Sequence, residues 1–273
     1  MTWNFRKYDY EICRDMDRFE ESSPQSSASA SLTQMTQKLE GFKFLLGLTE
    51  VVGVFLVILV MIWMTHFRGG FSWSDPNYVF NWHPVLMTIG LVFLYANGML
   101  IYRCKRTIRK QRLKLIHSGI LIFSLMLTII GLVSVFNSHN YQTPPIPNMY
   151  SLHSWVGLTS VILFACQWLA GFVSFLYPGV AVPLRSSYSP IHIYFGTAGF
   201  IGVITSCLLG LNEKAIFTLQ GKYSQFVEEG IFINIIGLVL LIFGGLTVYL
   251  VSQERYKREP RDEDNLLLSG RSN

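Results

Sequence analysis

Residues 116–136 read IHSGILIFSLMLTIIGLVSVF, a run of apolar residues that contains no Asp, Glu, Lys or Arg. At about 1.5 Å per residue, a helix of roughly 20 residues crosses the hydrocarbon core of a bilayer, which is about 30 Å thick. Of the 273 residues in the chain, 51% are hydrophobic and 14% are charged, whereas soluble domains usually contain about 25% charged residues. The run is therefore predicted to span a membrane.

Five further apolar runs resemble the first in length. They are predicted at residues 43–65, 84–102, 153–177, 191–211 and 231–251. None alternates in the manner of a barrel strand, and a helix satisfies its backbone hydrogen bonds within the segment. We therefore predict an all-α membrane protein with six transmembrane helices in one domain, residues 41–252.

The segments outside this domain are polar. Residues 1–40 include a Ser-rich stretch and are predicted to be a disordered tail. Residues 253–273 form a C-terminal tail in which DEDNLLL, residues 262–268, resembles an acidic dileucine sorting signal. Such a signal favours a late endosomal or lysosomal address, with a secretory vesicle or the plasma membrane as open alternatives.

Basic residues concentrate in the loop between the second and third spans, which carries no acid. They are Arg103, Lys105, Arg106, Arg109, Lys110, Arg112 and Lys114. Short loops rich in Lys and Arg stay in the cytoplasm, so this loop, the loop with Arg185 and both termini are predicted to be cytoplasmic. Because the positive charge is so localised, the net charge of +5 does not indicate binding to nucleic acid.

Four histidines lie at the starts of successive spans, namely His83, His117, His153 and His192. The second and fourth spans begin on the non-cytoplasmic side, so His83 and His153 share one depth. The third and fifth begin on the cytoplasmic side, so His117 and His192 share another. Two imidazoles facing each other across a four-helix core can ligate the iron of one porphyrin. The pattern predicts two bis-His haems within helices 2–5 and, because no iron position is left for oxygen, electron transfer.

A proton-coupled transporter that uses the histidines as a relay is the competing hypothesis, because ionisable residues at membrane depth are usually functional. Relays usually include carboxylates, and the second to fifth spans contain none. Glu50 lies in the first span, where snorkelling or a dimer contact competes with a proton path. His66 follows that span without a partner of equal depth and is interpreted as an interfacial residue.

Several motifs resemble the cytochrome b561 family. They are FNWHPVLM at residues 80–87, LIH at 115–117, YSLHSW at 150–155, PIH at 190–192 and GLNEK at 210–214. The resemblance covers about residues 43–255 and is greatest to the animal ascorbate-dependent branch. It implies a homodimer that passes electrons from cytoplasmic ascorbate through two b-type haems to ferric iron or monodehydroascorbate on the far side.

Basic residues near the cytoplasmic histidines are candidates for binding the ascorbate anion. Lys110 and Lys114 match lysines that the family associates with ascorbate, and residues four apart share one helix face. Arg103 and Arg185 are predicted to hold either ascorbate or haem propionates. The positive-inside rule alone would also account for any single base in these loops.

His139 and Asn140 follow the third span on the far side. The family resemblance implicates a histidine at this position in binding the acceptor, and a neutral imidazole can bind a metal ion or donate to an organic radical anion. A solvated loop histidine is the alternative interpretation.

Overall fold

The computed structural model describes residues 24–258, with side chains described from residue 41 onward. The chain divides into two compact units, residues 1–45 and 46–273. No strand occurs in the described range. The helical segments are α2 (Pro24–Ile62), η1 (Trp63–Phe67), α3 (Pro76–Val79), α4 (Trp82–Met87), η2 (Thr88–Leu94), α5 (Tyr95–Cys104), α6 (Lys110–Asn140), α7 (Leu152–Phe175), α8 (Val182–Leu219), η3 (Gln220–Gln225), α9 (Glu228–Ser252) and η4 (Glu254–Tyr256).

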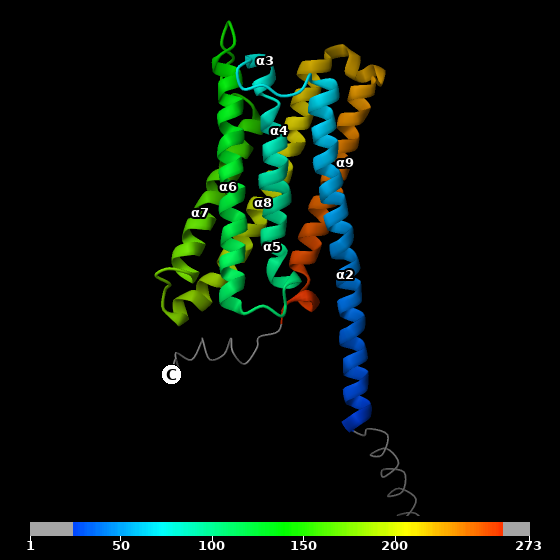
Figure 1. The fold of residues 1–273 in the computed structure, drawn as a ribbon, viewed down its shortest axis with the longest axis vertical. Helices are drawn as coiled ribbons and strands as arrows, with labels where there is room; N and C mark the ends of the chain where they lie inside the picture. Colours follow the sequence, from blue (N-terminus) through cyan, green and yellow to red (C-terminus); the bar gives the residue numbers. More distant parts are fainter. Residues whose placement is uncertain (1–23, 259–273) are drawn as a thin grey trace, which may run out of the picture. The chain divides into compact units, whose positions relative to one another are not determined.

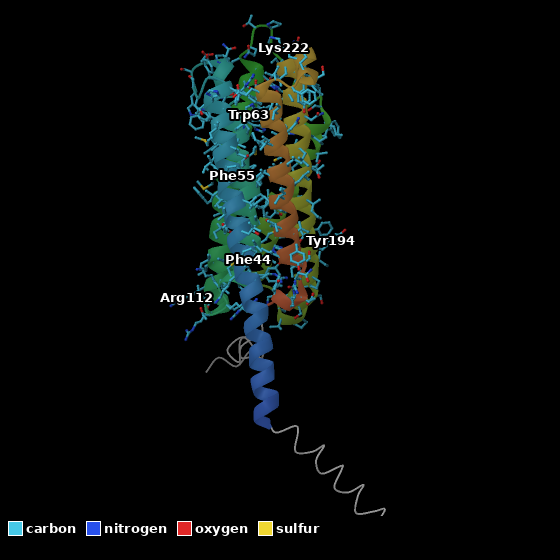
Figure 2. The ribbon with its side chains drawn as sticks, turned by 90° about the vertical axis from the view of Figure 1, so that its right-hand side faces the viewer. Phe44, Phe55, Trp63, Arg112, Tyr194 and Lys222 are labelled. Carbon is cyan, nitrogen blue, oxygen red and sulfur yellow. The ribbon has the colours of Figure 1, made fainter. Side chains whose placement is uncertain are left out.

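Six helical stretches within the described residues are long and apolar enough to cross a membrane. They are Gly41–Phe67, Pro76–Cys104, Lys110–Asn140, Leu152–Phe175, Val182–Gln225 and Glu228–Ser252. Side chains on the outside of these helices, such as Phe55 and Tyr194 in Figure 2, are apolar or aromatic and 47% and 68% exposed, as a lipid-facing surface requires. The prediction of an all-α protein with six spans is confirmed.

Two helices begin earlier than the sequence led us to expect. The backbone of residues 24–40, predicted to be disordered, belongs to α2, which begins at Pro24. Proline suits the first turn of a helix because an N–H group would be unpaired there. The helix α8 likewise begins before Pro190 and continues through it. As a correction, Arg185 therefore lies on a helix and not in a loop.

The helix α6 extends beyond the predicted third span at both ends, from Lys110 to Asn140. Both predicted ascorbate lysines are therefore helical, and His139 and Asn140 lie in the last turn of α6. Residues 1–23 of the predicted tail and the dileucine-like residues 262–268 lie outside the described residues.

The second to fifth spans pack together as a four-helix bundle within the second unit. The second span, formed by α4, η2 and α5, packs against α6, while α7 packs against α6 and α8, and α8 also contacts η2. The sixth span, α9, packs on α5 and α8 from outside this bundle. Figure 1 shows α4 and α7 beginning at the upper end of the bundle, whereas α6 and α8 begin at the lower end.

Aromatic side chains fill the middle of the bundle. Tyr95 lies with its ring centroid 4.4 Å from that of Phe164 and 5.6 Å from that of Phe200, and all three side chains are buried. The Tyr95 hydroxyl donates to the backbone carbonyl of Gly196 at 2.8 Å, so the buried phenol is satisfied. This buried aromatic cluster lies between the two ends of the bundle.

Candidate cofactor sites at the two ends of the bundle

The four histidines meet as the two pairs that their depths predict. At the upper end, the ring centroids of His83 on α4 and His153 on α7 are 6.2 Å apart and the ring planes are nearly perpendicular. At the lower end, the ring centroids of His117 on α6 and His192 on α8 are 6.3 Å apart. We call these the upper pair and the lower pair, because their histidines lie near the starts of α4 and α7, at the upper end in Figure 1, and toward the starts of α6 and α8, at the lower end.

The spacing of both pairs fits one metal ion held between two imidazoles. With a metal–nitrogen bond of about 2 Å on each side and about 1 Å from each nitrogen to its ring centroid, the centroids would lie about 6 Å apart. In the described part of the chain, no group of three or more His, Cys, Asp or Glu side chains could hold a metal ion. The donor set is therefore two nitrogens per site, which suits a metal whose other ligands come from a macrocycle.

Backbone carbonyls on neighbouring helices orient three of the four rings through their Nδ1 atoms. The contacts are His83 with Gly131 at 3.0 Å, His153 with Ser206 at 2.8 Å and His117 with Gly98 at 2.7 Å. A carbonyl oxygen only accepts, so each Nδ1 must carry the proton and each Nε2 keeps its lone pair for a metal. The Nδ1 atom of His192 is buried and has no hydrogen-bond partner.

Two glycines provide space for one ring of each pair. A Cβ atom added at Gly210 would lie 2.7 Å from Cε1 of His153, and one added at Gly171 would lie 2.8 Å from Cε1 of His192. Carbon atoms do not approach so closely without displacement, so these positions need glycine. Neither role is predictable from the sequence, because nothing in it shows which of the many glycines in apolar helices faces a histidine.

The distance between the pairs follows from helix geometry. Gly131, which contacts the upper pair, lies 14 residues after His117 on α6. Ser206, which also contacts the upper pair, lies 14 residues after His192 on α8. At 1.5 Å per residue, both helices separate the two pairs by about 21 Å along the bundle.

The upper pair opens into a cavity of about 560 Å³, which we call the upper cavity. Its walls include both histidines of the pair together with apolar side chains of α2, α6 and α9. This volume lies in the range of ligand-binding pockets, roughly 300–1,000 Å³. The upper cavity is thus large enough for a cofactor or a small organic molecule.

His139 also lines the upper cavity, as does Asn148 of the following loop. The Nδ1 atom of His139 lies 3.1 Å from Oδ1 of Asn148, whose Nδ2 donates to Oδ1 of Asn140 at 2.8 Å. The structure therefore brings His139 to the cavity, while Asn140 does not line it and contacts Asn148 instead. In the same loop, partial burial and then the nearby Glu213 carboxylate raise the pKa of Tyr150.

Basic side chains extend from the lower pair along two helices. Lys110 and Lys114 precede His117 by seven and three residues on α6, and Arg185 precedes His192 by seven on α8. At 3.6 residues per turn these positions share a helix face with the histidine that follows. Lys114 also donates from Nζ to the backbone carbonyl of Phe175 at 3.0 Å, at the end of α7.

Arg103 is buried near the lower end of the bundle, and its guanidinium contacts the end of α9. It donates to the backbone carbonyls of Val251 and Gln253 at the end of α9, where carbonyls have no partner within the helix. The structure thus gives Arg103 a role in capping α9, a helix outside the four-helix bundle. A contact between Arg103 and ascorbate or haem stays a prediction.

Several charged side chains near the spans make contacts that the sequence does not predict. Glu229 on α9 accepts from Nε1 of Trp63 at 2.8 Å and forms an ion pair with Arg68. Lys214 on α8 lies with Nζ 3.9 Å from the ring centroid of Phe80. Their partners come from distant segments, so local sequence signals do not reveal them.

Comparison with known proteins agrees with this geometry. The sequence profile described as eukaryotic cytochrome b561 matches residues 82–218, a segment that contains all four paired histidines. The transmembrane ascorbate-dependent reductase of Homo sapiens is 39% identical over 224 residues, which cover 82% of this chain and 88% of that protein. The chain belongs to the cytochrome b561 family. Membership implies b-type haem as the cofactor, and the two-nitrogen donor sets fit that group.

Other relatives of this cytochrome b561 family member carry names that describe a similar activity in different membranes. The plasma membrane ascorbate-dependent reductase of Xenopus laevis is 41% identical over 85% of this chain and 83% of that protein. The lysosomal membrane ascorbate-dependent ferrireductase of Homo sapiens is 40% identical over 76% of this chain and 87% of that protein.

Proposed function

We propose that this chain transfers single electrons across a membrane, from ascorbate on one side to an acceptor on the other, through two haems. The observation that carries the proposal is the presence of two imidazole pairs at opposite ends of one bundle, with centroids 6.2 and 6.3 Å apart. The relatives named as ascorbate-dependent reductases support the same activity.

The chain's own residues would hold a haem at each pair. When bound, haem would supply a one-electron iron couple. His83 and His153 would ligate the upper haem, and His117 and His192 the lower one. The carbonyl contacts of the Nδ1 atoms of His83, His153 and His117 fix the orientations of these three rings, which would limit reorganisation during electron transfer.

The lower end of the bundle is proposed to face the cytoplasm and to bind ascorbate. Lys110 and Lys114 on α6 and Arg185 on α8 supply positive charge on the helix faces that carry the lower pair. Ascorbate is a monoanion at neutral pH, and cationic donors bind oxyanions through charge-assisted hydrogen bonds. This orientation would place both termini in the cytoplasm, in agreement with the positive-inside rule.

The side of the upper cavity that His139 lines, beside the haem that His83 and His153 would hold, is proposed to receive the acceptor, either ferric iron or monodehydroascorbate. Because Asn148 engages Nδ1 of His139, Nε2 of that ring is left to bind a metal ion or an organic acceptor. The relative named as a ferrireductase favours iron, and its lysosomal membrane agrees with the dileucine-like sequence. A plasma membrane relative keeps that address open.

The chain is also proposed to form the homodimer that the family resemblance implies, and the mass of the purified complex tests this.

The proposal is tested with purified protein in liposomes that contain ascorbate inside. We expect a reduced b-type haem spectrum, reoxidation by an external ferric chelate or by monodehydroascorbate, and loss of this transfer in His83→Ala. If only the radical accepts electrons, the iron assignment fails. Folded protein without haem would overturn electron transfer and favour the proton-coupled transporter.

A further inference from the structure

Lys214 is a cationic residue that the proposed electron route leaves unused. It lies on α8, four residues after Gly210 and eight after Ser206, so the three positions share one helix face. Ser206 and Gly210 both contact His153. At 1.5 Å per residue, Lys214 lies about 6 Å beyond Gly210 along α8, on the face that serves the upper pair.

The side chain of Lys214 also lies near His83, the other histidine of the upper pair. Its Nζ lies 3.9 Å from the ring centroid of Phe80, and this ring centroid lies 6.0 Å from that of His83. Lys214 also lines the upper cavity together with both histidines. A cation within about 6 Å of an aromatic ring is attracted by the negative face of the ring. Phe80 therefore holds the ammonium group beside the upper pair.

The charge of Lys214 is not neutralised by a direct ion pair. Among the residues that the structure describes, no carboxylate lies within salt-bridge distance of its Nζ. At longer range the Arg68 cation repels the Lys214 ammonium group and the Glu229 carboxylate attracts it. The two oxygens of Glu229 are engaged by Trp63 and Arg68, and Glu213 lines the same cavity. A half-buried ammonium without a carboxylate partner attracts an anion into the cavity.

We propose that Lys214 binds an oxyanion in the upper cavity, either a carboxylate of the haem held by the upper pair or an electron acceptor that is itself an anion. This inference rests on the proposed function and narrows its substrate class. A bare ferric ion would be repelled by Lys214, whereas an anionic ferric chelate or an ascorbate radical anion would be attracted. The acceptor gains one electron from the upper site, and no bond forms or breaks.

Two variants of Lys214 and one control test this proposal. Lys214→Gln removes the charge, Lys214→Arg keeps it, and Lys222→Gln removes an exposed charge at the same end of the bundle (Figure 2). The full-length protein is reduced with ascorbate, and the rates of oxidation by anionic ferricyanide and by cationic hexaammineruthenium(III) are compared at low and high salt. The midpoint potential and the content of the upper haem are measured optically.

If the oxyanion is the acceptor, Lys214→Gln lowers the ratio of anionic to cationic rates about tenfold at low salt, and high salt reduces the difference. If it is a haem carboxylate, the midpoint potential of the upper haem falls while the ratio stays unchanged. In either case Lys214→Arg and Lys222→Gln resemble the wild type.

A Lys214→Gln protein that matches the wild type in rate ratio and potential would overturn the proposal. Loss of the upper haem in Lys214→Gln supports it if Lys214→Arg keeps the haem. Loss in both variants overturns it, because packing and not charge would then matter. Wild-type protein that ascorbate fails to reduce contradicts the proposed function itself.

Discussion

The two histidine pairs have the same spacing but differ in how their rings are held. In the upper pair, both Nδ1 atoms face backbone carbonyls, whereas in the lower pair His117 has such a contact and His192 has none. Helix packing alone thus brings two imidazoles to metal-binding distance. The surrounding hydrogen bonds then decide how firmly each ring is oriented, and the upper pair is the more preorganised of the two.

The surroundings of the pairs differ as well. The upper pair borders a cavity with His139 and Lys214 among its lining residues. Around the lower pair, Lys110 on α6 and Arg185 on α8 lie about two turns closer to the lower end than His117 and His192. Two sites with one ligand set can therefore serve different partners, because charge and shape around the ligands select what approaches them.

The largest effect is expected from removing one ligand of either pair. His83→Ala should lose the upper haem and keep the lower one, and His117→Ala should do the reverse, because the remaining imidazole cannot hold the haem iron from both sides. Haem per protein should fall to about half in each, as measured by absorbance. His66→Ala, which alters an exposed histidine outside both pairs, is the control. Full haem content in either ligand variant would contradict the pairing.

The second largest effect is expected from alanine at Gly210 or Gly171, the glycines that leave space for His153 and His192. Gly210→Ala should lose most of the upper haem, because Ser206 holds His153 and the ring cannot move away from the new Cβ atom. Gly171→Ala should lose less of the lower haem, because His192 has no hydrogen bond to break.

Gly196→Ala is the matched control on α8, since its added Cβ atom would meet nothing within 4 Å. Haem content and the optical spectrum report the outcome. Equal losses in Gly210→Ala and Gly171→Ala would mean that the hydrogen bonds do not set the difference between the pairs.

A variant of Arg103 tests whether this residue stabilises the end of α9 or binds substrate at the lower end. Arg103→Gln should lower the unfolding free energy by about 1–3 kcal/mol, because buried carbonyls at the end of α9 lose charged donors. Thermal unfolding measures this change against Lys105→Gln, which alters an exposed neighbour. Unchanged stability with a raised KM for ascorbate would instead support the predicted substrate contact.

The smallest effect is expected from single bases around the lower pair. Lys110→Gln or Arg185→Gln should raise the KM for ascorbate about threefold to tenfold, which corresponds to roughly 1 kcal/mol of lost binding. Initial rates of haem reduction measure it, with the exposed Arg112→Gln as the control. An equal effect in all three variants would indicate general attraction by the basic end and no defined site.

The sequence predicted the pairing of the histidines because spans that begin on the same side place their first residues at equal depth. It also predicted the six spans, because apolar length is a local property. The role of Gly210 and the capping of α9 by Arg103 were not predictable, because both depend on which faces of distant helices meet. The predicted fifth span begins at residue 191, whereas α8 begins at Val182 and continues through Pro190, because a proline can lie inside a packed helix.

The most direct test of the central claim is the haem content of purified, folded protein, determined by the pyridine haemochrome assay together with low-temperature EPR of the oxidised state. Two b-type haems per chain, both low-spin with two imidazole ligands, are the expected result. One haem per chain, no haem, or a high-spin site open to exogenous ligands would contradict it.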